Sequence, residues 1–589
     1  MDDALGKMVM DSLRANELAA QQILERVMGG MTERQPRLPA APKEVASGEP
    51  VAQLWPGTAY AEAFQSAQRM LGMMFQRPDV ALADINRYWT EQFRLYFGTS
   101  EIEPAKDDHR FQDPAWHENR YYKLAMQTHL SLKRGLDEWV DRLPVDHAQA
   151  ERIRFMVSLA TDALSPSNWP TNPAALKRYL ETGGKSAILG LQHMVEDAMA
   201  NGGMPSTVKP DALQVGRDLA TTAGKVVYRS EVFELIQYAP LTKQVHARPF
   251  LMVPPQFNRY YFYDLSEKKS LIRYAVEAGL QTFVISWRNP GLEHRDWNFD
   301  TYISAIEEAI DVVREITGSR DINLEGGCIA GMEVAALLAD LASRGEHKVH
   351  SATLMVTMFD TSVETPLGVL ATPNALEMAK AVSRMKGLMP GTEMGRVFAF
   401  LRPNDLIWNY WVNNYLLGNE PPVFDVLAWN ADTVRMTAGF HVDLLDLVQH
   451  NPLVRREFKV CGRPIRLDAI ECDQFWLAGL ADHITPWRAC YASSRLLKGK
   501  CEFVVSDGGH IQSMISSPSN PKAKYLVNDA LPDTAEAWLA GAAEQHSSWW
   551  PRWRGWIKAR SGKMQKAPRT LGSRAHRPLA DAPGTYVFE

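Results

Sequence analysis

Hydrophobic and polar positions change their spacing at about residue 220. Between about 60 and 215, apolar residues recur every three or four positions, as in "AYAEAFQSAQRMLGMMF", and this spacing predicts amphipathic helices. After 220, short apolar runs such as "LQTFVISW" and "CEFVVSD" alternate with helical stretches such as "YISAIEEAIDVVREITG". Alternating strands and helices predict a mostly parallel sheet with helices on both faces. The pattern therefore predicts a helical domain followed by an α/β domain.

The expected domain boundaries follow from these changes of pattern. Residues 1–57 contain a helical stretch and then a segment rich in Pro, Ala and charge, which predicts an N-terminal helix and a flexible linker. Residues 58–220 are the expected helical N-terminal domain, and 221–589 the expected α/β catalytic domain. Within the latter, residues from about 361 to 455 show almost no strand pattern and are dense in Trp, Tyr and Asn. We expect a helical cap there, over the C-terminal edge of the sheet.

The stretch "INLEGGCIAGMEVAALLAD", residues 322–340, has the pattern of a strand, a sharp turn and a helix. Hydrolases of the α/β type place a nucleophilic serine at such a turn, in the motif G-x-S-x-G. Here Cys328 holds the central position, and Ala330 stands where the motif has its last glycine. The small residues around Cys328 allow the strand and the helix to pass closely. The turn therefore predicts an α/β-hydrolase fold with Cys328 as its nucleophile.

Two further residues complete the predicted catalytic set. Asp482 in "LAGLADHITPW" and His510 in "VVSDGGHIQS" each follow a predicted strand, and the chain order nucleophile, acid, histidine is that of α/β-hydrolases. An imidazole can take the proton of a thiol, and a carboxylate can hold that imidazole in the correct tautomer. Asp507 is the main rival acid, although "SDGGH" is typical of a turn. His483 is the rival base, although only His510 follows the final strand.

The predicted oxyanion hole combines two backbone N–H groups. One belongs to Ile329, the residue after the nucleophile, and the other to the loop after "PFLMV". The two prolines that open this loop have no N–H. Gln256, Phe257 or Asn258 must therefore supply the second donor, and we take Phe257 as the candidate.

A cysteine nucleophile changes the class of reaction that the site favours. A serine would hold the acyl group as an oxygen ester, which water usually removes. A cysteine holds the acyl group as a thioester. Exchange with an incoming thioester then changes the free energy little, and the acyl group stays activated. A hydroxyl can then accept the group to give the more stable oxygen ester. Cys328 therefore favours acyl transfer from a thioester to an alcohol.

The charge, the cysteines and the N-terminal sequence argue against several classes of protein. The 589 residues carry a net charge of −5, which gives no electrostatic case for nucleic-acid binding. The five cysteines contain no C-x-x-C pair, so we expect neither a disulfide framework nor a zinc site, and a reducing compartment fits. An acidic start without an apolar core argues against a signal peptide, and no run of about 18 apolar residues predicts a membrane span. No metal or nucleotide motif is present, so we expect no cofactor.

Several blocks of sequence resemble polyhydroxyalkanoate synthases, most of all those of class II. "EGGCIAG", "LADHITPW" and "GGHIQS" are similar to the active-site blocks of that family. The resemblance extends to "RPFLMVPPQFNRYYFYDLSEKKSL", to "FLRPNDLIWNYWVNNYLLGNEPPVFDVLAWN" and to the N-terminal "FQDPAWHENRYYKLAMQTHL", and covers roughly residues 60–589. It implies a helical N-terminal domain and an α/β-hydrolase domain with a cap.

The resemblance also implies an activity. Members of the family join (R)-3-hydroxyacyl-CoA monomers to a growing polyester and release CoA, so CoA enters as part of the substrate. Cys328 matches the nucleophile of the family, His510 the base and Asp482 the acid, which is also proposed to help activate the monomer hydroxyl. A homodimer at the surface of polymer granules in the cytoplasm is implied, and class II implies medium-chain monomers.

Three departures from the family pattern lie next to the site: Ala330 in the nucleophile motif, and Leu480 and Ala481 where class II members usually carry hydroxyl residues. Two other functions stay open, a thioesterase or depolymerase on the same fold and a non-catalytic granule-associated protein. The basic, Trp-rich residues 551–577 predict either a phosphate-binding or hydrophobic-surface-binding segment, or a C-terminal helix docked by its tryptophans with a solvated tail. We favour the second.

Overall fold

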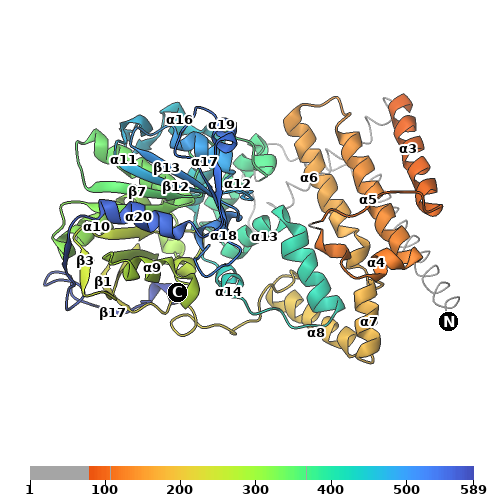
Figure 1. Ribbon diagram of the computed structural model, residues 1–589, viewed down its shortest axis with the longest axis horizontal. Coiled ribbons are helices and arrows are strands. Elements are labelled where there is room, and N and C mark those ends of the chain that lie inside the picture. Colours follow the sequence, from red (N-terminus) through yellow and green to blue (C-terminus); the bar gives the residue numbers. More distant parts are fainter. Residues whose placement is uncertain (1–77, 107, 367) are drawn as a thin grey trace. The chain divides into compact units, whose positions relative to one another are not determined.

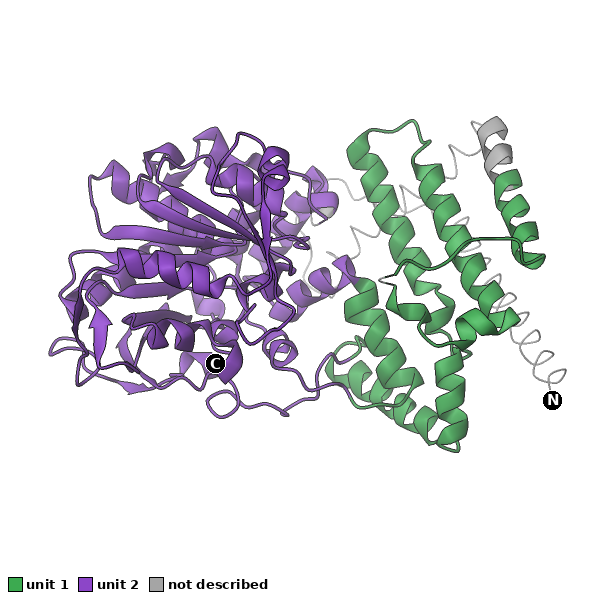
Figure 2. Ribbon diagram, in the orientation of Figure 1, with its two compact units in different colours: residues 1–205, 403–420 green, residues 206–402, 421–589 purple. Residues whose placement is uncertain are grey.

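The structure of the chain, a computed structural model, describes residues 78–106, 108–366 and 368–589. The N-terminal helix and linker that the sequence predicts within residues 1–57 lie outside the described residues. The chain divides into two compact units, shown in different colours in Figure 2. Unit 1 combines residues 1–205 with residues 403–420, and unit 2 contains the remainder.

An eleven-stranded sheet forms the centre of unit 2 (Figure 1). Its strands lie in the order β15-β14-β13-β12-β7-β6-β4-β5-β2-β1-β17. From β13 to β5 neighbouring strands run parallel, whereas the strands outside this set pair antiparallel. In chain order the strands are β1 (Gly224–Arg229), β2 (Phe233–Tyr238), β4 (Phe250–Val253), β5 (Thr282–Trp287), β6 (Ile322–Gly327), β7 (Val349–Met355), β12 (Asp473–Gly479), β13 (Cys501–Ser506), β14 (Tyr525–Val527), β15 (Ala543–Gln545) and β17 (Ala580–Asp581).

The central strands are buried on both faces, which explains their nearly continuous apolar sequence. In β4, Leu251 and Val253 belong to one hydrophobic cluster, and Phe250 and Met252 belong to another. Because side chains alternate along a strand, the two clusters occupy opposite faces of the sheet.

Helices cover both faces (Figure 1). The cluster of Leu251 includes side chains of α10 (Phe299–Thr317), α11 (Ile329–Ser343) and α17 (Trp487–Ser494). The cluster of Phe250 includes side chains of α9 (Leu271–Glu277) and α20 (Trp550–Arg560). The predicted α/β architecture is therefore confirmed. The apolar run at 225–238 forms the antiparallel hairpin of β1 and β2.

A mostly helical interval separates β7 from β12, as the predicted cap requires. It contacts the C-terminal edge of the sheet, because Thr433 forms a β-bridge with Asn258 in the loop after β4, and Phe440 packs against Phe257. Its elements within unit 2 are α12 (Pro373–Lys386), β8 (Leu388–Met389), α13 (Gly391–Leu401), α14 (Asp425–Ala431), β9 (Met436–Thr437), α15 (Ala438–His450) and α16 (Pro452–Arg455).

In the described residues of unit 1, the regular secondary structure consists of helices, which are joined by turns and irregular segments. The π-helical segment Trp411–Leu416 packs against α8 so closely that a Cβ atom at Gly190 would lie 1.9 Å from the carbonyl oxygen of Tyr415. The hydroxyl of Tyr415 also donates a hydrogen bond to Asp197 at 2.7 Å. The helices are α3 (Pro78–Tyr96), α4 (Ala115–Glu118), α5 (Arg120–Val140), α6 (His147–Ala163), α7 (Pro173–Glu181) and α8 (Lys185–Ala200). In the described part of the chain, no helix is both long and apolar enough to cross a membrane.

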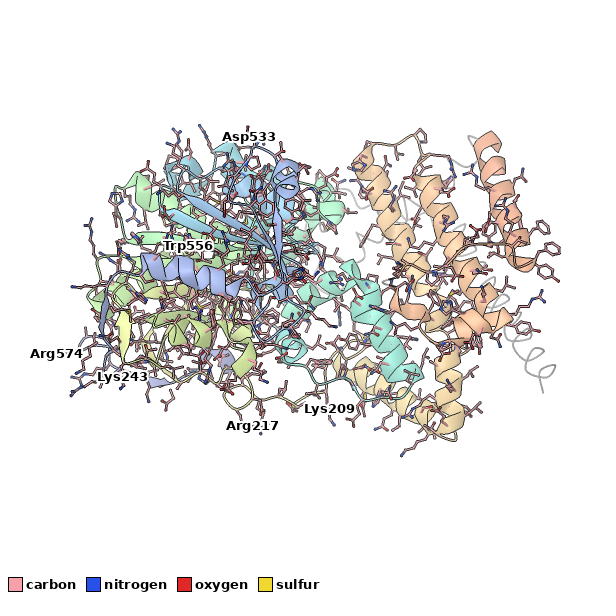
Figure 3. All side chains as sticks on the ribbon, in the orientation of Figure 1. Lys209, Arg217, Lys243, Asp533, Trp556 and Arg574 are labelled. Carbon is pink, nitrogen blue, oxygen red and sulfur yellow. The ribbon has the colours of Figure 1, made fainter. Side chains whose placement is uncertain are left out.

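The basic C-terminal segment is part of the fold. Trp553 is buried in α20, and its Nε1 donates to Thr353 Oγ1 at 3.1 Å; Trp556 on the same helix is labelled in Figure 3. The docked helix is therefore confirmed, and the basic side chains of the tail, such as Lys566, Arg569 and Arg574, are exposed to solvent as expected. The backbone of the tail is nevertheless held in place. Met564–Lys566 (β16) pairs with Gln244–His246 (β3), and β17 pairs with β1. Backbone pairing, which charge composition does not reveal, holds this segment against unit 2.

Candidate active site

The predicted nucleophile lies at a strained turn between β6 and α11. Cys328 follows β6 directly and has φ 55° and ψ −125°, a backbone conformation that is costly for a residue with a side chain. Close packing maintains it: a Cβ atom at Gly326 would lie 2.8 Å from the carbonyl oxygen of Ala330, and one at Gly331 would lie 2.7 Å from Cβ of Thr357. Ala330 itself is fully buried in the core. Glycine is thus required on both sides of the turn, and the fold accommodates the methyl group of Ala330.

Asp482 and His510 form a buried pair at the same edge of the sheet. Nδ1 of His510 donates to Oδ2 of Asp482 at 2.7 Å. The same carboxylate accepts hydrogen bonds from the N–H groups of Ile484 and Thr485 at 2.8 and 3.0 Å and from the hydroxyl of Thr485 at 2.8 Å. Burial alone would raise the pKa of Asp482, but the charge of His510 and these hydrogen bonds outweigh it and hold the pKa below its usual value. Asp482 is therefore an anion with a fixed orientation.

His510 links Asp482 to Cys328. Burial by itself would lower the pKa of His510, but the charges of Asp482 and Cys328 and hydrogen bonds to both side chains raise it above the usual value. A raised pKa favours the imidazolium, which is the partner that a reactive thiolate needs. Cys328 itself is only partly buried.

The rival residues lie elsewhere. Asp507 is exposed, and its own N–H donates to the carbonyl of Lys524, as its turn-like sequence suggests. His483 follows Asp482 directly but is not the histidine whose Nδ1 bonds that carboxylate. The structure therefore brings Cys328, His510 and Asp482 together.

The two candidate oxyanion donors lie on neighbouring elements. Ile329 is the first residue of α11, where a backbone N–H has no acceptor within the helix. Phe257 belongs to residues 254–258, named here the oxyanion loop, which follows β4. Val253 at the end of β4 pairs with Gly326, so this loop begins beside the turn that carries Cys328.

Comparisons with known proteins agree with this geometry. A family model described as the N-terminus of poly-beta-hydroxybutyrate polymerase (PhaC) matches residues 107–275, and a model of the alpha/beta hydrolase fold matches residues 252–516. Poly(3-hydroxyalkanoate) polymerase 1 of Ectopseudomonas oleovorans is 46% identical over 525 residues, which cover 89% of this chain and 94% of that protein. The chain belongs to the poly(3-hydroxyalkanoate) polymerase family. The predicted family is therefore confirmed, and the activity of this polymerase is acyl transfer.

Other relatives place the polymerase in the same family. The poly(3-hydroxyalkanoate) polymerase subunit PhaC of Cupriavidus necator is 39% identical over 520 residues, covering 86% of this chain and 88% of that protein. Among solved structures, a monoacylglycerol lipase of Paleococcus ferrophilus aligns at 14% identity with a TM-score of 0.29, covering 47% of this chain and 90% of that one. We draw nothing further from that likeness.

Sequence reasoning missed two buried acids that flank the nucleophile. Glu325 on β6 is fully buried and accepts a hydrogen bond from the hydroxyl of Tyr263 at 2.6 Å; burial raises its pKa well above the usual value. Glu333 on α11 is also fully buried, and Gln256 donates to it at 2.7 Å. The sequence feature that could have revealed them is the presence of one acid on each side of the nucleophile motif, in the otherwise apolar stretch "INLEGGCIAGMEVAALL". Both acids need a partner or a proton, because an isolated buried charge is costly.

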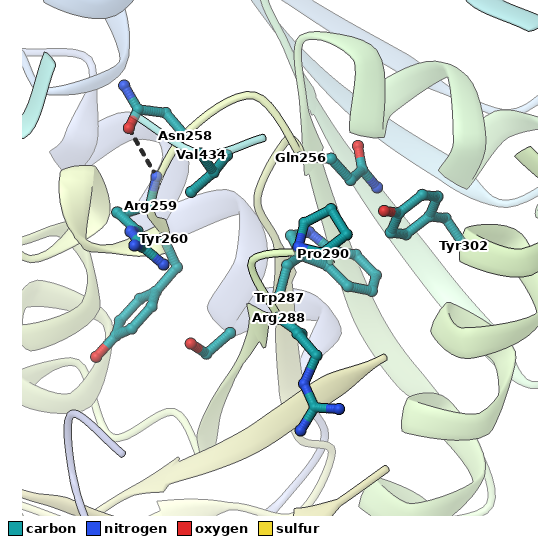
Figure 4. Close-up of a pocket in the computed structure, with 10 residues that line it drawn as sticks. Gln256, Asn258, Arg259, Tyr260, Trp287, Arg288, Pro290, Tyr302 and Val434 are labelled. Atoms are coloured by element: carbon teal, nitrogen blue, oxygen red, sulfur yellow. Dashed lines mark hydrogen bonds between the residues drawn. The ribbon is translucent and has the colours of Figure 1, made fainter. Parts of the chain in front are cut away.

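A small cavity of about 10 Å³ lies beside the oxyanion loop (Figure 4). This volume is about that of one water molecule, so the cavity cannot hold an acyl chain. Its lining includes three polar side chains, Gln256 and Asn258 from the oxyanion loop and Tyr302 from α10. In the described part of the chain, no cluster of three or more His, Cys, Asp or Glu side chains could hold a metal ion.

Proposed function

We propose that the polymerase transfers (R)-3-hydroxyacyl groups from CoA to a growing polyester through a thioester on Cys328. His510 is the proposed base and Asp482 the residue that orients it. The observation that carries the proposal is the hydrogen bond between His510 and Asp482, next to a cysteine at a strained turn whose charge acts on His510, in a chain of this family.

In the first step, the thiolate of Cys328 attacks the carbonyl carbon of the incoming acyl-CoA. A carbon–sulfur bond to Cys328 forms, and the carbonyl oxygen becomes an oxyanion that the N–H groups of Ile329 and Phe257 stabilise. The carbonyl re-forms, the bond to the CoA sulfur breaks, and the imidazolium of His510 gives its proton to the departing thiolate. The acyl group is now bound to the enzyme.

In the second step, the hydroxyl of another 3-hydroxyacyl unit attacks the thioester. His510, now neutral, takes the proton of that hydroxyl, and Asp482 stabilises the imidazolium that forms. A carbon–oxygen bond forms, the bond to Cys328 breaks, and the sulfur leaves as the thiolate that began the cycle. The product is an oxygen ester one unit longer, and no external reductant or oxidant is needed.

Three finer features extend the proposal. The likeness to class II synthases supports medium-chain monomers, and the family implies a homodimer that works at the surface of polymer granules in the cytoplasm. The part of the cap in unit 2, which packs on the oxyanion loop through Phe440, is the segment whose movement would admit the monomer.

The decisive experiment supplies purified protein with the (R) forms of 3-hydroxybutyryl-, 3-hydroxyoctanoyl- and 3-hydroxydecanoyl-CoA. Free thiol reports CoA release, and turbidity reports insoluble polymer. We expect both signals with the two longer substrates, and neither in Cys328→Ala or Cys328→Ser. The serine variant keeps the shape of the turn but lacks a thiolate, so it separates chemistry from folding.

Other outcomes identify the alternatives. Thiol release with free hydroxy acid and no polymer would indicate a thioesterase or depolymerase. Unchanged signals in Cys328→Ala would indicate that Cys328 is not the nucleophile. A preference for 3-hydroxybutyryl-CoA would contradict the medium-chain assignment while leaving the reaction intact.

A further inference from the structure

A buried hydrogen bond joins the oxyanion loop to the nucleophile helix. Nε2 of Gln256 donates to Oε2 of Glu333 at 2.7 Å, and the two residues are 5% and 0% exposed. Gln256 immediately precedes Phe257 in the loop, whereas Glu333 lies on α11, the helix that begins at Ile329. The bond therefore connects the two segments that carry the proposed oxyanion donors.

The pair has unused hydrogen-bonding capacity. Oε1 of Gln256 and Oε1 of Glu333 are both buried and have no partner among the described residues. Burial raises the pKa of Glu333 to about 8, although the hydrogen bond from Gln256 lowers it, so the carboxyl is neutral at neutral pH. A neutral carboxyl offers one O–H donor, and a primary amide offers one donor and one acceptor. An acid and an amide of this kind are complementary for two parallel hydrogen bonds.

The other polar anchors of the loop lead to elements other than α11: Nε1 of Trp287 donates to the carbonyl of Pro254 at 2.7 Å, and Asn258 forms a β-bridge with Thr433. Figure 4 shows Gln256 and Tyr302 facing one another beside the small cavity. Tyr302 lies on α10 and is buried; its burial, and then the nearby Glu333, raise its pKa. Among the described residues, the side-chain hydrogen bond that joins this loop to α11 is the one between Gln256 and Glu333.

We propose that Gln256 and Glu333 are positioning residues that set the distance between the N–H of Phe257 and that of Ile329. The inference rests on the proposed function, because it assumes that these two groups bind the oxyanion. Donors in an oxyanion hole must lie about 2.7–3.1 Å from the position of the charged oxygen. A loop displaced by about 1 Å would lose much of that stabilisation.

The test uses full-length variants at these two positions. Gln256→Leu and Glu333→Leu remove the polar contact at similar volume, and the double variant Gln256→Glu with Glu333→Gln exchanges the partners. Asp340→Asn is the matched control: Asp340 is a buried acid on the same helix, but it pairs with Arg344 and Arg463 and does not touch the loop.

The first measurement separates kcat from KM for CoA release. We expect kcat to fall about 10- to 100-fold in both leucine variants, with KM within about threefold of wild type, because the lost interaction forms only in the transition state. The exchanged pair should recover most of kcat. Asp340→Asn should lower the melting temperature and leave kcat unchanged.

The second measurement is the rate at which iodoacetamide alkylates Cys328. Alkylation needs the thiolate but forms no oxyanion, so the leucine variants should react within about twofold of the wild-type rate. Unchanged kcat in the leucine variants, equal losses of kcat and alkylation rate, or an exchanged pair no better than the single variants would each overturn the proposal.

Failure of the proposed function would give a different pattern. If Cys328→Ala still released CoA at the wild-type rate, the assignment of the nucleophile would be wrong whatever the leucine variants did. If Cys328→Ala were inactive and the leucine variants fully active, only the role of Gln256 and Glu333 would be wrong.

Discussion

At the scale of single residues, Asp482 and His510 set one another's charge in the candidate site. The carboxylate of Asp482 accepts hydrogen bonds from two backbone N–H groups, from Thr485 and from His510. It therefore remains charged although it is buried, and its charge favours the imidazolium of His510. In the proposed mechanism, this imidazolium is the partner of the Cys328 thiolate.

Asp482→Asn tests this dependence. The amide keeps the shape of the carboxylate but does not stabilise an imidazolium, so we expect kcat to fall by roughly 10³- to 10⁴-fold, as in related triads. Asp507→Asn is the control, because Asp507 is exposed, and its kcat should equal that of wild type. CoA release from the preferred monomer measures both. A larger loss in Asp507→Asn than in Asp482→Asn would reverse the assignment of the acid.

At the scale of elements, α11 combines two roles in one helix. From Ile329 to Leu341 every residue is buried, so the helix is part of the core, and the proposed nucleophile Cys328 directly precedes its first turn. A buried carboxylate on this helix needs a cationic partner, which Asp340 has in Arg344 and Arg463. Glu333 accepts a hydrogen bond from the neutral Gln256 instead, and burial raises its pKa to about 8.

The stability of the protein should depend on pH through Glu333. Its pKa is raised to about 8 in the folded chain, whereas an unfolded chain has about 4.3. The folded state then binds the proton of Glu333 more tightly than the unfolded state does. The contribution of Glu333 to the free energy of unfolding is therefore complete below about pH 4 and is lost as the pH rises towards 8. Between pH 5.5 and 7.5, the free energy of unfolding of wild type should fall by roughly 2–3 kcal/mol relative to that of Glu333→Gln.

Urea denaturation of both proteins at the two pH values measures this difference. Groups common to both, such as His510 and Asp482, cancel in the comparison. Parallel stability curves for wild type and Glu333→Gln would mean that Glu333 is ionised in the folded state.

At the scale of the whole molecule, the chain twice uses distant segments to complete a unit. Residues 403–420 follow the first cap helices in sequence but belong to the helical unit. The C-terminal residues return to β1 and β3 and add strands at their edges. Neither return is visible in local periodicity, because each depends on contacts between residues far apart in the chain.

Gly190→Ala tests the attachment of the first of these segments. Its methyl group would lie 1.9 Å from the carbonyl oxygen of Tyr415, so the backbone of one segment must move, at a cost of about 1–3 kcal/mol. We expect faster hydrogen exchange in residues 403–420. Gly135→Ala in α5 is the control, because a Cβ atom there meets nothing within 4 Å, and alanine should stabilise that helix by about 0.5–1 kcal/mol. Equal exchange in the two variants would contradict the close packing.

Much of the fold and of the site could be read from the sequence. Strand and helix periods are local, so the alternation after residue 220 was enough to predict a parallel sheet. In such a sheet the ends of parallel strands meet at one edge, so residues that follow three separate strands, Cys328, Asp482 and His510, were expected together.

Only the tertiary structure decided the rest. It showed that Glu325 and Glu333 lie in the core, that Gln256 links the oxyanion loop to α11, and that the basic C-terminal segment pairs with strands. Burial and pairing of this kind arise from contacts across the whole chain, and a local pattern records only which face of an element is apolar. The sequence by itself thus determined the type and order of the elements and nominated the proposed reacting groups, whereas long-range packing determined which polar side chains support them.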